Sequence, residues 1–275
     1  MVERYYVDNV TQFSKDELQD VLRASTPPIC LLGGWAVHFH VNEPFRGATG
    51  REYIGSRDID LGIHVDPESS PEELEDRAVG QTLRGTEEQG FQRSRFGFKK
   101  TVDRETGVTL SEEAARTSAM HELFEIYIDL LPDRREPENF EEAFGFRPPA
   151  EPLLQPVFEE DAGEPLTDHV GFEVTEDVLI ADVPVLVAMK VRSTPDRNKN
   201  QKRVKDIADI HSLLWYVDDI AKVIDETAVY LDSGDIERFD NSVSETLVDQ
   251  AASLISVDSD VVRASTNRLT QETSS

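Results

Sequence analysis

Two aspartates stand two residues apart in the stretch Gly55–Ile63, GSRDIDLGI, where apolar side chains alternate with polar ones. This alternation predicts a strand over residues 53 to 65, on which Asp58 and Asp60 project from the same face. Their Cα atoms then lie about 6.6 Å apart. Two ionised carboxylates this close repel each other unless a cation lies between them, and Mg²⁺ prefers oxygen ligands. The pair therefore indicates a metal site; the alternative is a strand whose polar face is solvated.

A third aspartate and a pair of glycines accompany this motif. Asp129 interrupts the apolar run 126–131, and Gly33-Gly34 directly follow the apolar run 29–32. Both runs are predicted strands, and burial of a lone carboxylate is costly, so Asp129 is expected to share a cation or a polar partner. The glycines either end a strand or let phosphate oxygens reach backbone N–H groups at a helix N-terminus. The three acids and the glycine turn thus define one candidate site.

A basic segment runs from Lys190 to Lys205 in an otherwise acidic chain. It holds seven of the 28 Lys and Arg residues, whereas Asp and Glu total 55. A chain so rich in acids is expected to lose bases from ordinary solvated faces, so this concentration favours a phosphate-binding segment. The alternative is a solvated loop.

The composition describes a folded, acidic protein. The formal net charge is -27, the pI is about 4.5, and hydrophobic residues make up 38% of the chain, which is too many for a disordered acidic polymer. The acids are spread along the whole length, in a pattern that resembles the proteins of salt-loving archaea. In molar salt the Debye length falls to about 3 Å, so the repulsion between such charges is screened. The net charge therefore indicates a halophilic habitat and identifies no partner.

The single cysteine and the hydropathy pattern predict a soluble cytoplasmic protein. Because Cys30 is the single cysteine of the sequence, no intrachain disulfide can form, and its apolar neighbours predict that it lies in the core. No apolar stretch reaches the roughly 18 residues of a membrane span, and the N-terminus lacks the apolar core of a secretory signal. We expect no membrane partner.

Hydrophobic periodicity predicts a mixed α/β fold whose second part is helical. Strands are predicted over 29–32, 53–65, 91–102, 123–131 and 171–181, and residues 148–168 read as a loop or an edge strand. Turn-forming residues predict an exposed loop over 42–50. Helices are predicted over 14–24, 70–89, 184–192, 205–217, 220–231 and 242–257. The expected domains are a catalytic domain over 1–183, a helical domain over 184–262, and a frayed tail over 263–275.

Three motifs together resemble a known family: GGWAV at residue 33, SRDIDL at residue 56, and the helix Lys205–Ile210 after the basic segment. Their order is similar to that of the AbiEii toxin-type nucleotidyltransferases, within the superfamily of DNA polymerase β. The resemblance implies a mixed sheet flanked by helices, followed by a helical domain that closes over the nucleotide. It also implies a nucleoside triphosphate as substrate and two Mg²⁺ or Mn²⁺ ions as cofactors.

The resemblance assigns roles to residues of the candidate site. It implies that Gly33 and Gly34 approach the triphosphate and that Asp58 and Asp60 bind both metals. It implies that Asp129 completes the second metal site and helps to activate the attacking hydroxyl.

The resemblance also extends to the basic segment. It implies that Lys190 contacts the triphosphate, with Arg192 as a further nucleotide-binding residue. Ser56, which stands just before the acids, contacts phosphate or braces the turn, and we expect it to be a nucleotide-binding residue. Possible supporting residues are Arg57, Lys205, Asp206 and Asp209; Arg57 is expected to brace the turn, and a structural role is equally open for Asp209.

The implied reaction moves a nucleoside monophosphate onto an acceptor hydroxyl. An RNA acceptor, in particular a tRNA 3′ end, is favoured, and the enzyme is expected as the toxin of a pair with a cognate antitoxin. The alternatives are a small-molecule or protein adenylyltransferase and a non-catalytic interaction module on the same fold. The chain departs from the family in spacing, since Asp58 follows Gly34 by 24 residues. We expect the extra length to form a surface insertion.

Overall fold

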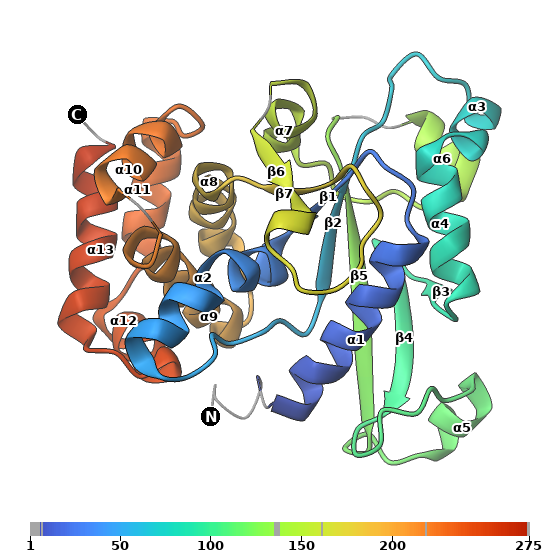
Figure 1. The fold of residues 1–275 in the computed structure, drawn as a ribbon, viewed down its shortest axis with the longest axis horizontal. Helices are drawn as coiled ribbons and strands as arrows, with labels where there is room; N and C mark the ends of the chain where they lie inside the picture. The colour runs from blue at the N-terminus through green and yellow to red at the C-terminus, as the bar shows by residue number, and fades with distance from the viewer. Residues whose placement is uncertain (1–5, 7, 135–137, 161, 218, 274–275) are drawn as a thin grey trace. The chain divides into compact units, whose positions relative to one another are not determined.

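The computed structural model describes residue 6 and residues 8–134, 138–160, 162–217 and 219–273. The chain divides into two compact units (Figure 1). The sheet unit comprises helix α1 (Asp8–Ala24) through Trp35 and the segment Gly55–Ala181. The helical unit comprises Tyr6, Ala36–Ile54 and the chain from Asp182 onward. The helical unit is discontinuous, because Ala36–Ile54 belongs to it, whereas the sequence predicted a single division after residue 183.

A seven-stranded mixed sheet forms the core of the sheet unit, which confirms the predicted α/β class. Its strand order is β3-β4-β5-β2-β1-β7-β6. At the centre, β2 runs antiparallel to β1 and parallel to β5, and β1 runs parallel to β7. The strands are β1 (Ile29–Leu32), β2 (Ile59–Ile63), β3 (Gln92–Arg93), β4 (Gly97–Asp103), β5 (Leu123–Pro132), β6 (Gly163–Pro165) and β7 (Val178–Ala181).

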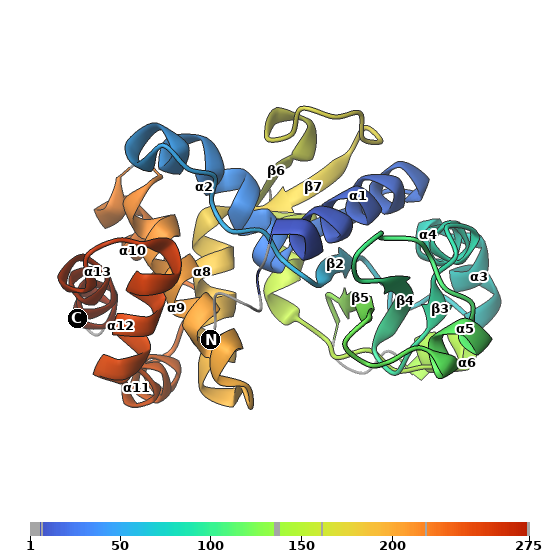
Figure 2. The same cartoon turned by 90° about the horizontal axis from the view of Figure 1, so that it is seen from below.

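The two faces of this sheet differ in polarity. Along β5 the apolar side chains of Phe124, Ile126, Ile128 and Leu130 are buried, and the residues between them are only partly buried. Figures 1 and 2 show α1 and α4 (Ala78–Glu88) running beside the strands. An ion pair of 2.5 Å between Lys100 Nζ on β4 and Glu17 Oε2 on α1 links the buried face of the sheet to helix α1. The opposite face of the sheet carries the partly buried residues that alternate with the buried apolar ones along β5, Glu125, Tyr127 and Asp129 among them.

The remaining helices of the sheet unit are short. They are α3 (Pro71–Asp76), α5 (Glu112–Thr117), α6 (Glu138–Phe144) and α7 (Gln155–Glu159). The predicted helix over 70–89 is two helices, because Arg77 adopts an extended conformation with ψ 177° between α3 and α4. At Gly80 a Cβ would lie 2.1 Å from the carbonyl oxygen of Glu75, so the tight packing of the two helices requires glycine.

The loop predicted over 42–50 was wrong, since these residues continue helix α2 (Gly33–Thr49). Val37, Val41 and Phe45 recur every four residues and are buried, and this apolar stripe outweighs the turn-forming residues around Pro44. The helix ends at Thr49, and Gly50, whose positive φ of 73° suits a C-terminal cap, follows it.

In the part of the chain that the structure describes, the rest of the helical unit contains six α-helices and a short 3-10 helix (Thr194–Asp196). The α-helices are α8 (Val183–Ser193), α9 (Asn200–Trp215), α10 (Ile220–Ala228), α11 (Ser233–Ser242), α12 (Glu245–Ile255) and α13 (Ser259–Glu272). Every residue of α9 from Val204 to Leu214 is buried, which makes α9 the central helix of this unit. The frayed tail predicted from residue 263 was wrong up to Glu272, because α13 buries Val262 and Leu269. Among the described residues, no helix has the length and apolarity needed to cross a lipid bilayer.

Candidate functional site

The acids of the candidate site lie at the centre of the sheet. Asp60 on β2 is the register partner of Asp129 on the parallel strand β5. Register partners on neighbouring strands lie about 4.8 Å apart and point to the same face. Asp58 lies immediately before β2, two residues from Asp60. All three side chains are partly buried and belong to residues on the polar face of the sheet.

A glycine turn lies against one of these carboxylates. Leu32, the last residue of β1, pairs with Asp60, and Gly33 follows with a positive φ of 63°. A Cβ on Gly33 would lie 1.9 Å from Oδ2 of Asp60. Helix α2 begins at the same glycine, so Gly33 and Gly34 bring its N-terminal N–H groups beside the acids. The conformation and the close approach both require glycine at residue 33.

We expect the substitution Gly33→Ala to weaken both the fold and the acid cluster. The left-handed conformation costs a residue with a Cβ roughly 1–2 kcal/mol, and the new methyl group must displace the carboxylate of Asp60. Urea unfolding should show that loss of stability. If the acids bind Mn²⁺, as the sequence predicts, a Mn²⁺ titration should show at least about tenfold weaker binding. Gly47→Ala in the same helix is the control, because nothing lies within 4 Å of its added methyl group. Wild-type Mn²⁺ affinity in Gly33→Ala would contradict the expectation that the turn holds the Asp60 carboxylate in position for a metal.

Three further residues extend the polar face, and none was singled out from the sequence. Tyr127 precedes Asp129 by two positions on β5, and its hydroxyl donates a 2.6 Å hydrogen bond to Oε2 of Glu125. Lys99 on β4 forms a 3.1 Å ion pair with Oε1 of the same glutamate. Burial, Glu125 and the charges of Asp58 and Asp129 raise the pKa of Tyr127 well above its usual value. In the sequence, the alternation of apolar and polar residues along β5 indicated that Glu125 and Tyr127 share a face with Asp129.

The residues before β2 take different positions. Ser56 is buried. The guanidinium of Arg57 lies 4.8 Å from the centroid of the Phe124 ring, whose side chain belongs to the buried face. Arg57 therefore packs on the side of the sheet opposite to the acids, a contact compatible with bracing the turn.

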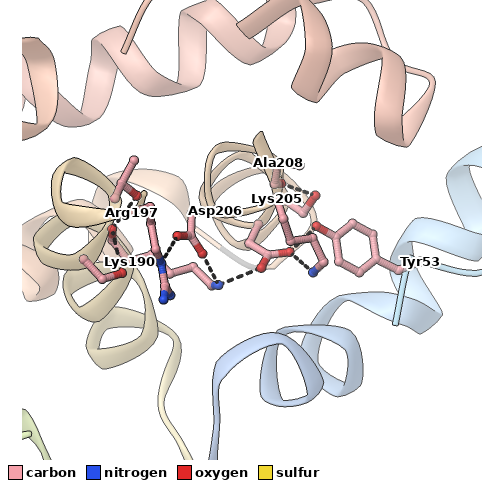
Figure 3. A network of polar contacts seen from close by, with 10 residues as sticks. Tyr53, Lys190, Arg197, Lys205, Asp206 and Ala208 are labelled. Carbon is pink, nitrogen blue, oxygen red and sulfur yellow. Dashed lines mark hydrogen bonds and ion pairs between the residues drawn. The ribbon is translucent and has the colours of Figure 1, made fainter. Parts of the chain in front are cut away.

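The lysines at the two ends of the basic segment are buried in the helical unit (Figure 3). Lys190 on α8 forms ion pairs of 3.1 Å with Asp206 Oδ1 and 2.7 Å with Asp209 Oδ2. Lys205 forms a 2.5 Å ion pair with Asp209 Oδ1. Asp206 and Asp209 therefore share one face of α9, as their spacing of three residues predicts.

Tyr53, which is buried, and Arg197, whose side chain is 38% exposed, complete this network (Figure 3). The Tyr53 hydroxyl donates to Asp209 Oδ1 at 2.7 Å, and Arg197 Nε donates to Asp206 Oδ2 at 2.9 Å. Burial alone would raise the pKa of Asp209, but the charges of Lys190 and Lys205 outweigh it and hold that pKa below its usual value. Burial lowers the pKa of Lys205. The network joins three cationic and two anionic side chains around the middle of α9.

The rest of the basic segment is more accessible. Arg192 Nε lies 4.0 Å from Asp235 Oδ2, and the Arg192 side chain is 28% exposed. Lys199 is exposed at the start of α9, and Lys202 and Arg203 are partly buried. The basic segment thus combines buried lysines with a partly solvated surface. The sequence predicted either a phosphate-binding segment or a solvated loop, and neither prediction included buried ion pairs.

The candidate residues fall into two groups by unit. Gly33, Gly34, Ser56, Arg57, Asp58, Asp60 and Asp129 belong to the sheet unit, and Lys190, Arg192, Lys205, Asp206 and Asp209 belong to the helical unit. Comparisons of the chain with protein-family models, with curated protein sequences and with solved structures returned no match.

Proposed function

We propose that this protein is a metal-dependent nucleotidyltransferase, which moves a nucleoside monophosphate from a nucleoside triphosphate to an acceptor hydroxyl. One observation carries the proposal. Asp60 and Asp129 occupy the same register on adjacent parallel strands, with Asp58 two residues before Asp60 and the Gly33 turn against the Asp60 carboxylate. An acid cluster beside a helix N-terminus brings together ligands for a cation and donors for a phosphate.

The chemistry of the donor set fits a hard divalent cation. Asp58, Asp60 and Asp129 offer carboxylate oxygens only, which suit Mg²⁺ or Mn²⁺ better than softer metals. These three residues would hold the metal, which when bound supplies neutralisation of phosphate charge and activation of the attacking hydroxyl.

The chain's own residues have separate tasks in this reaction. Gly33 and Gly34 present backbone N–H groups at the start of α2, where the triphosphate gains hydrogen bonds without obstruction by a side chain. In this proposal the carboxylate of Asp129 accepts the proton of the acceptor hydroxyl as the pyrophosphate leaves in line. The ammonium of Lys190 is engaged by Asp206 and Asp209, so the proposal rests on the acid cluster and not on this lysine.

An RNA acceptor, with a tRNA 3′ end as the first candidate, is the preferred substrate in this proposal. The support is the resemblance of GGWAV, SRDIDL and the Lys205 helix to the AbiEii toxin-type enzymes. That resemblance also motivates a role as the toxin of a toxin–antitoxin pair. Transfer to a small molecule or to a protein hydroxyl uses the same acid cluster and is the second candidate.

A label-transfer assay tests the proposal. The protein is incubated with each α-labelled nucleoside triphosphate, Mg²⁺ and total RNA in molar KCl, and the assay is repeated with Asp58→Ala and with a chelator. We expect label in RNA with the wild type and none in either control. Transfer that survives Asp58→Ala would contradict the metal site. Absence of transfer to RNA, protein and small-molecule acceptors alike would favour a non-catalytic interaction module.

A further inference from the structure

A second basic stretch lies on the hairpin of β3 and β4. Residues 89–102 contain no Asp or Glu, although these two residue types make up 55 of the 275 residues in the chain. The same stretch carries four bases, Arg93, Arg95, Lys99 and Lys100. In a protein with a net charge of -27, this stretch is a local exception that favours contact with an anionic partner.

The tip of this hairpin is fixed beside the acid cluster. Gly97 is the register partner of Asp129, and the carbonyl oxygen of Phe96 accepts a 3.2 Å hydrogen bond from the N–H of Leu130. A Cβ on Gly97 would lie 2.0 Å from the carbonyl oxygen of Ile128, so the two backbones approach closely there. The N–H of Ser94 closes the turn by donating to the Gly97 carbonyl at 2.8 Å. Residues 94–96 therefore have a defined position next to Asp129.

The side chains at the tip are exposed and stacked. Phe96 is 41% exposed, and the guanidinium of Arg95 lies 4.8 Å from the centroid of its ring. The other bases of the hairpin have carboxylate partners: Arg93 pairs with Glu87, Lys99 with Glu125, and Lys100 with Glu17. Within the part of the chain that the structure describes, Arg95 forms no ion pair. An exposed ring with an arginine over it is a surface on which nucleobases stack and near which a phosphate gains a partner.

We propose that Arg95 and Phe96 form a platform for the acceptor, on which a base near the 3′ end of a single-stranded RNA stacks beside Asp129. This inference rests on the proposed function, since it assigns the acceptor side of the same acid cluster. Phe96 supplies the stacking surface, which works in molar salt, and Arg95 supplies a contact to the RNA backbone that salt weakens. Asp129 lies one strand away, so the platform orients the terminal hydroxyl toward the acids.

The test separates RNA binding from catalysis. Fluorescence anisotropy measures the affinity of a short, fluorescein-labelled single-stranded RNA in molar KCl without nucleoside triphosphate, and label transfer then gives the KM for the same RNA. We expect Phe96→Ala to weaken binding and to raise the KM about 5- to 100-fold, and Phe96→Trp to restore both. The Arg95→Ala defect should shrink as KCl increases. Met120→Ala, which truncates an apolar side chain that is 91% exposed in the same unit, is the matched control and should bind as the wild type does.

Each outcome has a distinct meaning. Loss of RNA affinity in Phe96→Ala with rescue by Phe96→Trp supports the platform, even where no acceptor is labelled and the proposed transfer fails. Normal transfer with unchanged RNA affinity and KM in Phe96→Ala overturns the platform and leaves the transferase standing. Wild-type protein that binds no single-stranded RNA also overturns the platform. Self-association that depends on Phe96, without an effect on RNA, would assign the tip to a protein interface and overturn it as well.

Discussion

Replacement of Asp209 by alanine is expected to lower the free energy of unfolding by about 3–5 kcal/mol. Asp209 is fully buried and contacts Lys190, Lys205 and Tyr53 at distances of 2.5–2.7 Å. Its removal leaves two buried ammonium groups with only Asp206 nearby, and an unpaired buried charge is costly. Urea unfolding at fixed molar KCl measures the effect, because urea leaves the ionic strength unchanged.

Two variants show whether this loss arises from the buried charge. Glu226→Ala removes the partner of Lys222 in an ion pair whose side chains are 70% and 49% exposed, and it should change the stability by less than about 1 kcal/mol. The double substitution Asp209→Asn with Lys205→Met removes one charge of each sign and should recover part of the loss. A loss in Asp209→Ala as small as that in Glu226→Ala would show that the buried network contributes little to stability.

Asp129→Asn is expected to reduce nucleotidyl transfer by at least about 10²- to 10³-fold. The amide keeps the size of the side chain but removes one negative charge, and metal binding at such a site supplies several kcal/mol of transition-state stabilisation, at about 1.4 kcal/mol per tenfold change in rate. The affinity for Mn²⁺ should fall in parallel. Label transfer and Mn²⁺ titration in molar KCl measure the two effects.

Stability distinguishes this role from a structural one. Without added metal, Asp129→Asn should keep a cooperative urea transition and lose at most about 1–3 kcal/mol, because the amide keeps the size of the side chain and can still form hydrogen bonds. Glu113→Gln on the exposed helix α5 makes the same chemical change outside the cluster and should leave transfer unaltered. Near-normal transfer in Asp129→Asn, or a large loss of stability without a loss of metal affinity, would contradict the assignment.

Local patterns in the sequence predicted two of the central strands closely, whereas the strand predicted over 53–65 is confined to Ile59–Ile63. The apolar run at Ile29 and the alternation from Leu123 to Leu131 match β1 and β5 closely, because side-chain period and β propensity are local properties. The loop predicted over 42–50 failed for the opposite reason. Burial of Val41 and Phe45 depends on tertiary contacts, and these override the turn propensity of the residues around Pro44.

In the candidate site, too, local features were predictable from the sequence and features that depend on tertiary structure were not. The spacing of Asp58 and Asp60 predicted a shared face, but the alignment of Asp60 with Asp129 depends on strand register, which no local pattern specifies. The approach of Gly33 to the Asp60 carboxylate depends on where β1 ends against β2. In the basic segment, the bases were visible from composition, whereas the burial of Lys190 and Lys205 against two aspartates was not.

The discontinuous make-up of the helical unit has a consequence for dissecting the protein. Tyr53, whose hydroxyl donates to Asp209, comes from the segment Ala36–Ile54, and all of Gly55–Ala181 intervenes before the rest of the unit. A fragment that starts at Asp182 contains the lysines and aspartates of the network but lacks the tyrosine. A truncation after Ala181 leaves Ala36–Ile54 without the helices of its own unit. Neither the fragment before Asp182 nor the fragment from Asp182 onward is therefore a complete folding unit. Coexpression of the two fragments, so that they can assemble, is the better way to study them as separate chains.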